Sequence, residues 1–278
     1  ALGYSITGEN CEECMFYLHG PGRSGKGTML NTVNSVLGEP IATGAGFGIF
    51  TQREGDPQNF RLAPLRNARL VIASESNEKQ VLSDNLVKQL TGGGDPVQAC
   101  YKYRAPFVFI PRFKIWLMSN YPPFGNMDDE AFWWRIRLIM LTKNYMDNPD
   151  LTLKGRLQEQ DERQATLSFL IRGATDWYQQ GLGRPAWQKN ALRRTRAEQD
   201  PLQRFLDEQT IPAPGQQLDL NDLYNAYEQW CTDESIEAQQ KNVISRRLGA
   251  KGYSLEKKRV RVGKVRRQIL VEGIALVP

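Results

Sequence analysis

The chain has 278 residues, of which 40% are hydrophobic and 24% charged, a composition typical of globular domains, and its net charge is +5. The length allows one large domain or two smaller ones. No apolar run approaches the roughly 18 residues of a membrane span and no basic-then-apolar leader is present, so we expect a cytoplasmic protein without membrane contacts. The first residue is Ala1 and not methionine, which is typical of a piece of a longer protein.

The cysteines offer little for a metal site. Cys11 and Cys14 form a C-x-x-C pair, but the sequence has no second pair and His19 is its only histidine. A four-ligand zinc site would therefore need distant ligands. We expect reduced thiols of a cytosolic protein.

A glycine-rich sequence lies between an expected strand at 15–20 and an expected helix at 27–38. This is the setting of a phosphate-binding loop, in which backbone N–H groups and the helix N-terminus hold phosphates and a lysine reaches the β- and γ-phosphates. We therefore expect ATP to bind here. The expected contact residues are Gly20, Pro21, Gly22, Arg23, Ser24, Gly25, Lys26, Gly27 and Thr28.

One residue departs from the usual motif. Gly27 stands where a serine or threonine normally offers a hydroxyl to Mg²⁺, and Thr28 follows one residue late. Adenylate kinases have the same G-K-G-T run, so the metal can be held by phosphates, waters and a neighbouring group. We expect Mg²⁺ as a cofactor, with Thr28 as the substitute ligand. A nucleoside monophosphate kinase is accordingly one alternative.

Two further strands end in polar residues. The run at 68–76 ends in Ser74 and Glu75, and the run at 113–120 ends in Asn120. An acid at the carboxyl end of a parallel strand beside a phosphate loop is where an ATPase orients the attacking water. This pattern favours an ATPase over a monophosphate kinase.

Between these strands the sequence predicts a hairpin. Alternating runs around 97–101 and 107–110 are joined by a turn-like segment that carries Lys102 and Arg104. Arg135 and Arg137 then precede a last apolar strand.

The positive charge is concentrated near the C-terminal end. Residues 241–267 contain eleven basic residues and one acid, a net charge of +10, so the rest of the chain sums to −5. This density is typical of a nucleic-acid surface. Helical periodicity at 220–230, a second helix at 239–252 and a basic hairpin around Gly263 accompany it.

The order and spacing of these motifs resemble the superfamily 3 helicases. The resemblance is greatest to the C-terminal helicase part of phage, plasmid and poxvirus primase-helicases, and it covers nearly the whole chain. It implies an α/β fold with a P-loop, AAA+-like core and a parallel sheet over 1–150, a helical segment over 151–210 and a winged-helix DNA-binding domain over 218–278. We expect a linker at 211–217, which contains prolines and a glycine.

The resemblance also implies catalytic roles. Lys26 would bind the β- and γ-phosphates, Glu75 would polarise the attacking water and contact the metal, and Asn120 would sense the γ-phosphate. Arg135 matches the second arginine of the family's W-R-R motif and would be an arginine finger. Trp134 replaces the first arginine, which leaves Arg137 as a rival.

The implied function is that of an ATP-dependent DNA helicase of phage or mobile-element type. It would form a ring, expected to be a hexamer, translocate from 3′ to 5′ on single-stranded DNA and unwind duplex DNA, in a bacterial or viral replication context, with a primase domain or protein as a partner. A non-catalytic DNA-binding module is the second alternative. The expected DNA contacts are Lys102, Arg104, Arg246, Arg247, Lys257, Lys258, Arg259 and Arg261.

Overall fold

The computed structural model describes residues 1–51, 59–74, 81–262 and 264–277; within these ranges it describes the backbone alone at 59 and 259–267. The chain folds into two compact units, Ala1–Thr195 and Arg196–Pro278. Glu75, the expected water-polarising residue, lies outside the described residues. None of the described helices is both long and apolar enough to span a bilayer.

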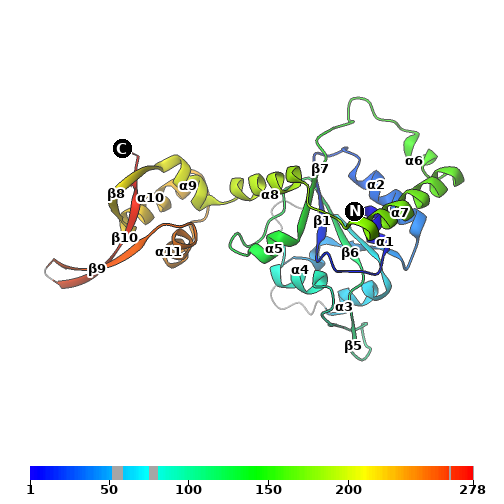
Figure 1. Cartoon of the computed structure of the whole chain (residues 1–278), viewed down its shortest axis with the longest axis horizontal. Coiled ribbons are helices and arrows are strands. Elements are labelled where there is room, and N and C mark those ends of the chain that lie inside the picture. Colours follow the sequence, from blue (N-terminus) through cyan, green and yellow to red (C-terminus); the bar gives the residue numbers. More distant parts are fainter. Residues whose placement is uncertain (52–58, 75–80, 263, 278) are drawn as a thin grey trace. The chain divides into compact units, whose positions relative to one another are not determined.

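Within the described residues, a five-stranded sheet forms the centre of the first unit (Figure 1), in the order β2-β3-β6-β1-β7. Every neighbouring pair is parallel, so the expected α/β fold with a parallel sheet is confirmed. The strands are β1 (Met15–His19), β2 (Ala42–Gly46), β3 (Leu70–Ser74), β6 (Lys114–Ser119) and β7 (Ile136–Met140).

Both faces of the sheet are covered, as parallel sheets require. Alternate residues of β1 point to opposite faces: Phe16 and Leu18 belong to one apolar cluster, and Met15 and Tyr17 to the other. The first cluster includes residues of α1 (Leu2–Ile6), α2 (Lys26–Leu37) and α7 (Gln160–Gln180). The second includes residues of η1 (Phe47–Ile49), α3 (Asn59–Leu62), η2 (Ala63–Asn67), α4 (Asp84–Thr91) and α5 (Glu130–Arg135).

The register places the carboxyl ends of β1, β6 and β7 side by side. His19 of β1 lies opposite Ser119 of β6 on one side and Met140 of β7 on the other. The residues that follow these strands therefore meet at the carboxyl edge of the sheet. At the amino edge, Ile136 lies opposite Met15, so residues that precede β7 sit at the other end.

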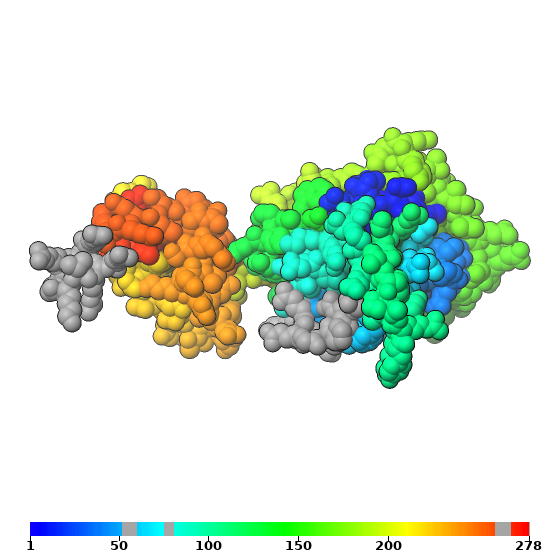
Figure 2. Space-filling model, turned by 90° about the horizontal axis from the view of Figure 1, so that it is seen from below, coloured from blue at the N-terminus to red at the C-terminus, as the bar shows by residue number. Residues whose placement is uncertain are grey.

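The expected hairpin is present. Strands β4 (Val97–Ala99) and β5 (Phe107–Phe109) pair antiparallel, with Ala99 opposite Phe107. Figure 1 shows this hairpin projecting away from the central sheet, and Figure 2 shows it as a green protrusion from the same unit. The turn between β4 and β5 therefore lies at the far end of a two-stranded hairpin, exposed to solvent.

The second unit combines helices with an antiparallel sheet of order β8-β10-β9. Leu223 and Tyr227, which belong to the helical periodicity at 220–230, are buried in the core of this unit, so these side chains serve packing. Helix α6 (Leu153–Arg156) belongs to the first unit, and α8 (Ala186–Glu198) spans the boundary. The elements of the second unit are α9 (Pro201–Gln209), β8 (Thr210–Asp219), α10 (Leu220–Asp233), α11 (Lys241–Ala250), β9 (Leu255–Val262) and β10 (Lys264–Leu276).

The linker expected at 211–217 is wrong, because this segment lies within β8. β8 is at the edge of its sheet, where it pairs with β10, so a proline that cannot donate is tolerated there. The register shifts between Glu272 and Gly273, whose partners are Gln217 and Ala213. The intervening residues 214–216 bulge out of the ladder, which is why the sequence has the composition of a loop.

Candidate functional site

The phosphate loop joins β1 to α2 at the carboxyl edge of the sheet. Arg23 and Gly25 have positive φ angles of 57° and 89°, and α2 begins directly afterwards at Lys26. A Cβ atom at Gly20 would lie 2.1 Å from the carbonyl oxygen of Leu141, so only glycine fits there. The loop has the left-handed turns and the helix start that a phosphate cradle needs.

Lys26 is buried and its ammonium group is fully engaged. It donates to the carbonyl oxygens of Gly20 at 2.7 Å and Pro21 at 2.8 Å, and to the hydroxyl of Ser24 at 3.1 Å. It also donates to Oδ1 of Asn120 at 3.0 Å. Desolvation lowers the pKa of Lys26 from its ordinary value.

Asn120 reaches this lysine because of strand order. β6 lies next to β1 in parallel, so the residue after Ser119 arrives beside the residue after His19. The turn is fixed by the amide of Tyr121, which donates to the Ser119 hydroxyl at 2.8 Å. The structure thus brings together two of the expected catalytic side chains, Lys26 and Asn120.

β3 ends at the same edge, at Ser74, where Glu75 follows outside the described residues. In the sheet β3 is separated from β1 by β6 alone. At about 4.8 Å per strand the axes of β3 and β1 are roughly 10 Å apart.

The surroundings of Gly27 bear on the metal. A Cβ atom there would have one described neighbour within 4 Å beyond the local chain, Nδ2 of Asn31 at 3.9 Å. The position is open, so a water can occupy the space where other loops place a hydroxyl. Among the described residues no group of three or more His, Cys, Asp or Glu side chains could hold a metal ion. A Mg²⁺ ion fits if phosphates and waters supply most of its ligands, as Mg²⁺ tolerates.

Arg135 lies at the opposite edge from the phosphate loop of its own chain. It ends α5, immediately before Ile136, which pairs with Met15. Its guanidinium donates to the carbonyl of Ala131 at 2.9 Å and to the carboxylate of Glu13 at 3.0 Å. The four residue steps of β1 alone separate the two ends by about 13 Å.

Arg137 is a poorer candidate for the finger. It is only 2% exposed and donates to the carbonyl of Trp134 at 2.9 Å. Its guanidinium also lies 5.2 Å from the Trp134 ring, against which Arg184 packs at 4.7 Å. Burial and stacking on a tryptophan make this guanidinium less accessible than that of Arg135.

The hairpin turn carries a residue that the sequence interpretation missed. Tyr103 lies between the expected contacts Lys102 and Arg104, both of which are exposed. Its side chain is 93% exposed, and its φ angle of 65° is unusual for a residue other than glycine. Nζ of Lys102 lies 5.1 Å from the ring centroid. An aromatic residue between two cations in a turn was the available signal.

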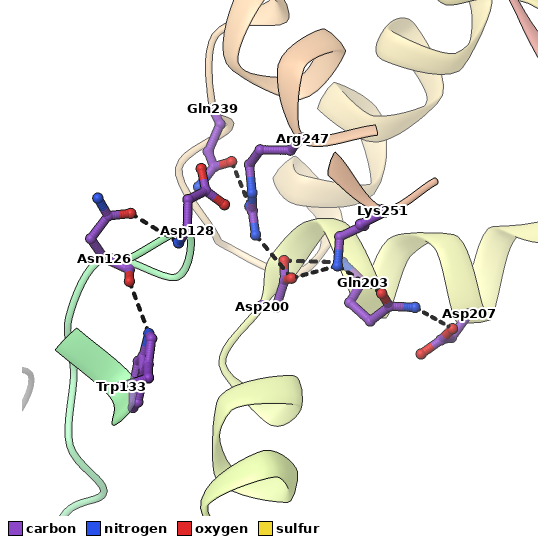
Figure 3. Close-up of polar contacts among 9 residues, drawn as sticks. All are labelled: Asn126, Asp128, Trp133, Asp200, Gln203, Asp207, Gln239, Arg247 and Lys251. Carbon is purple, nitrogen blue, oxygen red and sulfur yellow. Dashed lines mark hydrogen bonds and ion pairs between the residues drawn. The ribbon is translucent and has the colours of Figure 1, made fainter. Parts of the chain in front are cut away.

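The basic residues of the second unit do not all lie on the surface. Arg247 is buried and forms an ion pair with Asp200 at 2.9 Å, and it donates to Oε1 of Gln239 at the same distance. Lys251 also contacts Asp200 at 2.9 Å (Figure 3). Arg247 was expected to contact DNA, but its guanidinium is occupied in the core.

The remaining expected DNA contacts lie on α11 and β9. Arg246 is exposed on α11, and Lys257 is exposed on β9. Lys258 is also exposed, and its ammonium lies 3.1 Å from Glu256. Arg259 and Arg261 belong to the same strand, which pairs with β10, but their side chains lie outside the described part of the structure.

Comparisons with known proteins find similarity to viral proteins named as putative helicases. Residues 18–136, less than half of the chain, match a family described as a family of unknown function (DUF5906). The chain is 22% identical over 249 residues to "Putative helicase L207/L206" of Acanthamoeba polyphaga mimivirus, covering 82% of this chain and 26% of that protein. It is 25% identical over 135 residues to "Putative helicase V13" of Sputnik virophage, covering 47% of this chain and 17% of that protein.

The chain thus spans about a quarter or less of the length of these curated relatives. Among solved structures, the apo structure of the NrS-1 C-terminal region matches with a TM-score of 0.56 and 15% identity, covering 94% of this chain and 67% of that one. This likeness supports the fold.

Proposed function

We propose that this chain is the motor part of an ATP-dependent DNA helicase of the superfamily 3 type. The observation that carries the proposal is the contact between Lys26 of the phosphate loop and Asn120 at the end of the adjacent strand. A lysine for the phosphates and a polar side chain beside it are the parts that an ATPase needs at the γ-phosphate. The viral relatives named as helicases support the same reading.

In hydrolysis, each of the expected catalytic residues at the carboxyl edge of the sheet would have a separate role. When ATP binds, the ammonium of Lys26 would release the carbonyls of the loop and donate to oxygens of the β- and γ-phosphates. Asn120 would then lose its hydrogen bond with Lys26 and contact the γ-phosphate instead. Glu75 would orient the attacking water. Thr28 and Glu75 would hold a Mg²⁺ ion together with phosphates and waters, and this ion would neutralise phosphate charge.

Arg135 would complete the site of another copy. It lies at the amino edge of its own sheet, where it cannot reach its own phosphate loop. In a ring, expected to be a hexamer, that edge would face the loop of the next copy. Arg135 would then give up its ion pair with Glu13 and contact the γ-phosphate bound by the neighbouring copy.

The DNA contacts would be divided between the two units. The hairpin turn, with Lys102 and Arg104, would bind the phosphates of single-stranded DNA in the ring, and Tyr103 would stack on a base. In the second unit, α11 and the β9–β10 hairpin would form a winged helix that contacts duplex DNA through Arg246, Lys257 and Lys258, with Arg259 and Arg261 on the same strand. Translocation from 3′ to 5′, a cytoplasmic location in a bacterial or viral replication context, and a primase domain or protein as a partner are parts of the proposal that rest on the resemblance alone.

Steady-state ATP hydrolysis with and without single-stranded DNA tests the proposal. We expect turnover that rises when DNA is added and that disappears in Lys26→Ala. A monophosphate kinase would instead transfer phosphate to a second nucleotide without any effect of DNA. A DNA-binding module would bind DNA without turnover. Either result would refute the helicase assignment.

A further inference from the structure

The chain that follows β7 runs beside the first half of the phosphate loop, from Gly20 to Arg23. At the start, the amide of Leu141 donates to the carbonyl of His19 at 2.8 Å, and the Leu141 carbonyl lies against Gly20. Further along, the amide of Tyr145 donates to the carbonyl of Arg23 at 3.2 Å. Residues 141–145 therefore form a wall beside the loop, and their backbone is attached to it at both ends.

Two large apolar side chains at the end of this wall, those of Tyr145 and the following Met146, are open to solvent. Tyr145 is 51% exposed and Met146 is 60% exposed. The backbone between them is fixed by a turn, because the amide of Met146 donates to Oδ1 of Asn144 at 2.7 Å. An aromatic ring and a thioether on neighbouring residues beside the phosphate loop offer apolar surface that the described part of the chain leaves open to solvent.

We propose that Tyr145, with Met146 beside it, binds the base of the nucleotide whose phosphates the loop holds. The inference rests on the proposed nucleotide site and adds the subsite for the nucleobase. The phosphates occupy the N–H groups of the loop and α2, so the nucleoside must leave the loop along one of its walls. Residues 141–145 are one such wall, and Tyr145 provides an aromatic side chain there.

Stacking depends on the face of a base and not on its hydrogen-bonding edge, so the subsite does not distinguish adenine from guanine. ATP and GTP should therefore bind within a few-fold of each other. Removal of the ring should weaken binding by about 5- to 20-fold, toward the lower end of base stacking on aromatic side chains because Tyr145 is half exposed. The backbone contact of Tyr145 with Arg23 uses the amide, so Tyr145→Ala retains the attachment of the wall.

The experiment compares the binding of Mg²⁺-ATP and of Mg²⁺-tripolyphosphate, which has the phosphates but no base, by calorimetry. We expect Tyr145→Ala to lose ATP affinity and to retain tripolyphosphate affinity, and Tyr145→Phe to bind both as the wild type does. Tyr178→Ala removes a similarly exposed tyrosine from α7 and serves as the matched control.

Unchanged ATP affinity in Tyr145→Ala overturns the inference and leaves the phosphate site intact, provided that Lys26→Ala loses tripolyphosphate. Equal loss of ATP and tripolyphosphate also overturns it, because Tyr145 would then support the loop and not the base. If the wild type binds neither compound, the proposed nucleotide site is wrong, and the base subsite is rejected with it.

Discussion

Replacement of Asp200 by asparagine should destabilise the second unit by roughly 3 kcal/mol. Asp200 is the N-cap of α9 and accepts a hydrogen bond from the Gln203 amide at 3.1 Å. It also pairs with Arg247 of α11 and with Lys251, the C-cap residue of α11, each at 2.9 Å. The Arg247 side chain is only 4% exposed, whereas that of Lys251 is 23% exposed and can turn to water. Loss of one partner of a buried pair costs about 3–5 kcal/mol, and we take the lower end because Arg247 would keep its hydrogen bond to Gln239.

The asparagine side chain of this variant would still offer an oxygen to the α9 cap, so Asp200→Ala should cost about 1 kcal/mol more. Native-state hydrogen exchange of the most protected amides in α9 and α11 measures the free energy of opening. Asp207→Asn makes the same chemical change at an exposed position of α9 and should stay within about 0.5 kcal/mol of the wild type. The reasoning fails if both Asp200 variants match this control.

The same network should depend on pH. Burial raises the pKa of Asp200, but the Lys251 hydrogen bond and the Arg247 charge outweigh it, and the pKa lies below its ordinary value. Because the folded pKa is depressed, this stabilisation is complete above the unfolded value of about 4 and is lost as the pH falls through the folded value. Protection of α11 in Asp200→Asn should lack this acid-dependent loss.

Glu75→Gln should retain ATP binding and lose turnover, measured by calorimetry and phosphate release; hydrolysis at the wild-type rate would show that the acid after β3 does not orient water. Alanine at Lys102 and Arg104 should spare basal ATPase and abolish its stimulation by single-stranded DNA, whereas equal loss of basal turnover would make the hairpin a structural element. Arg135→Ala should lower turnover by roughly 10³-fold or more, and mixing it with Lys26→Ala should restore part of the ATPase. No recovery in rings shown to be mixed would exclude action between copies.

The local motifs of the first unit could be predicted because each is set by short-range rules. The parallel strands that end at His19 and Ser119 are apolar runs, and the hairpin has turn residues between alternating segments. β2 could not be found in this way. Its sequence, Ala42–Gly46, consists of small residues and threonine, so only the neighbouring β3 defines it as a strand.

Features that depend on long-range partners were beyond the sequence. Arg247 resembles its exposed neighbour Arg246 in the sequence, and only the fold shows that it meets Asp200, which lies far earlier in the chain. Tyr145 lies in a polar segment without periodicity, and its place beside Arg23 arises from the β1–β7 pairing. Charge and composition predict what kind of group is present, whereas burial decides what it can bind.

The separation of Arg135 and the phosphate loop at opposite ends of one sheet has a consequence for the proposed hydrolysis of ATP. If the two groups meet only across a contact between copies, a solitary chain has every catalytic group and still cannot consume ATP. Turnover per chain would then rise with protein concentration and level off once assembly is complete. Separate copies would leave ATP intact until they assemble, with no separate inhibitor required.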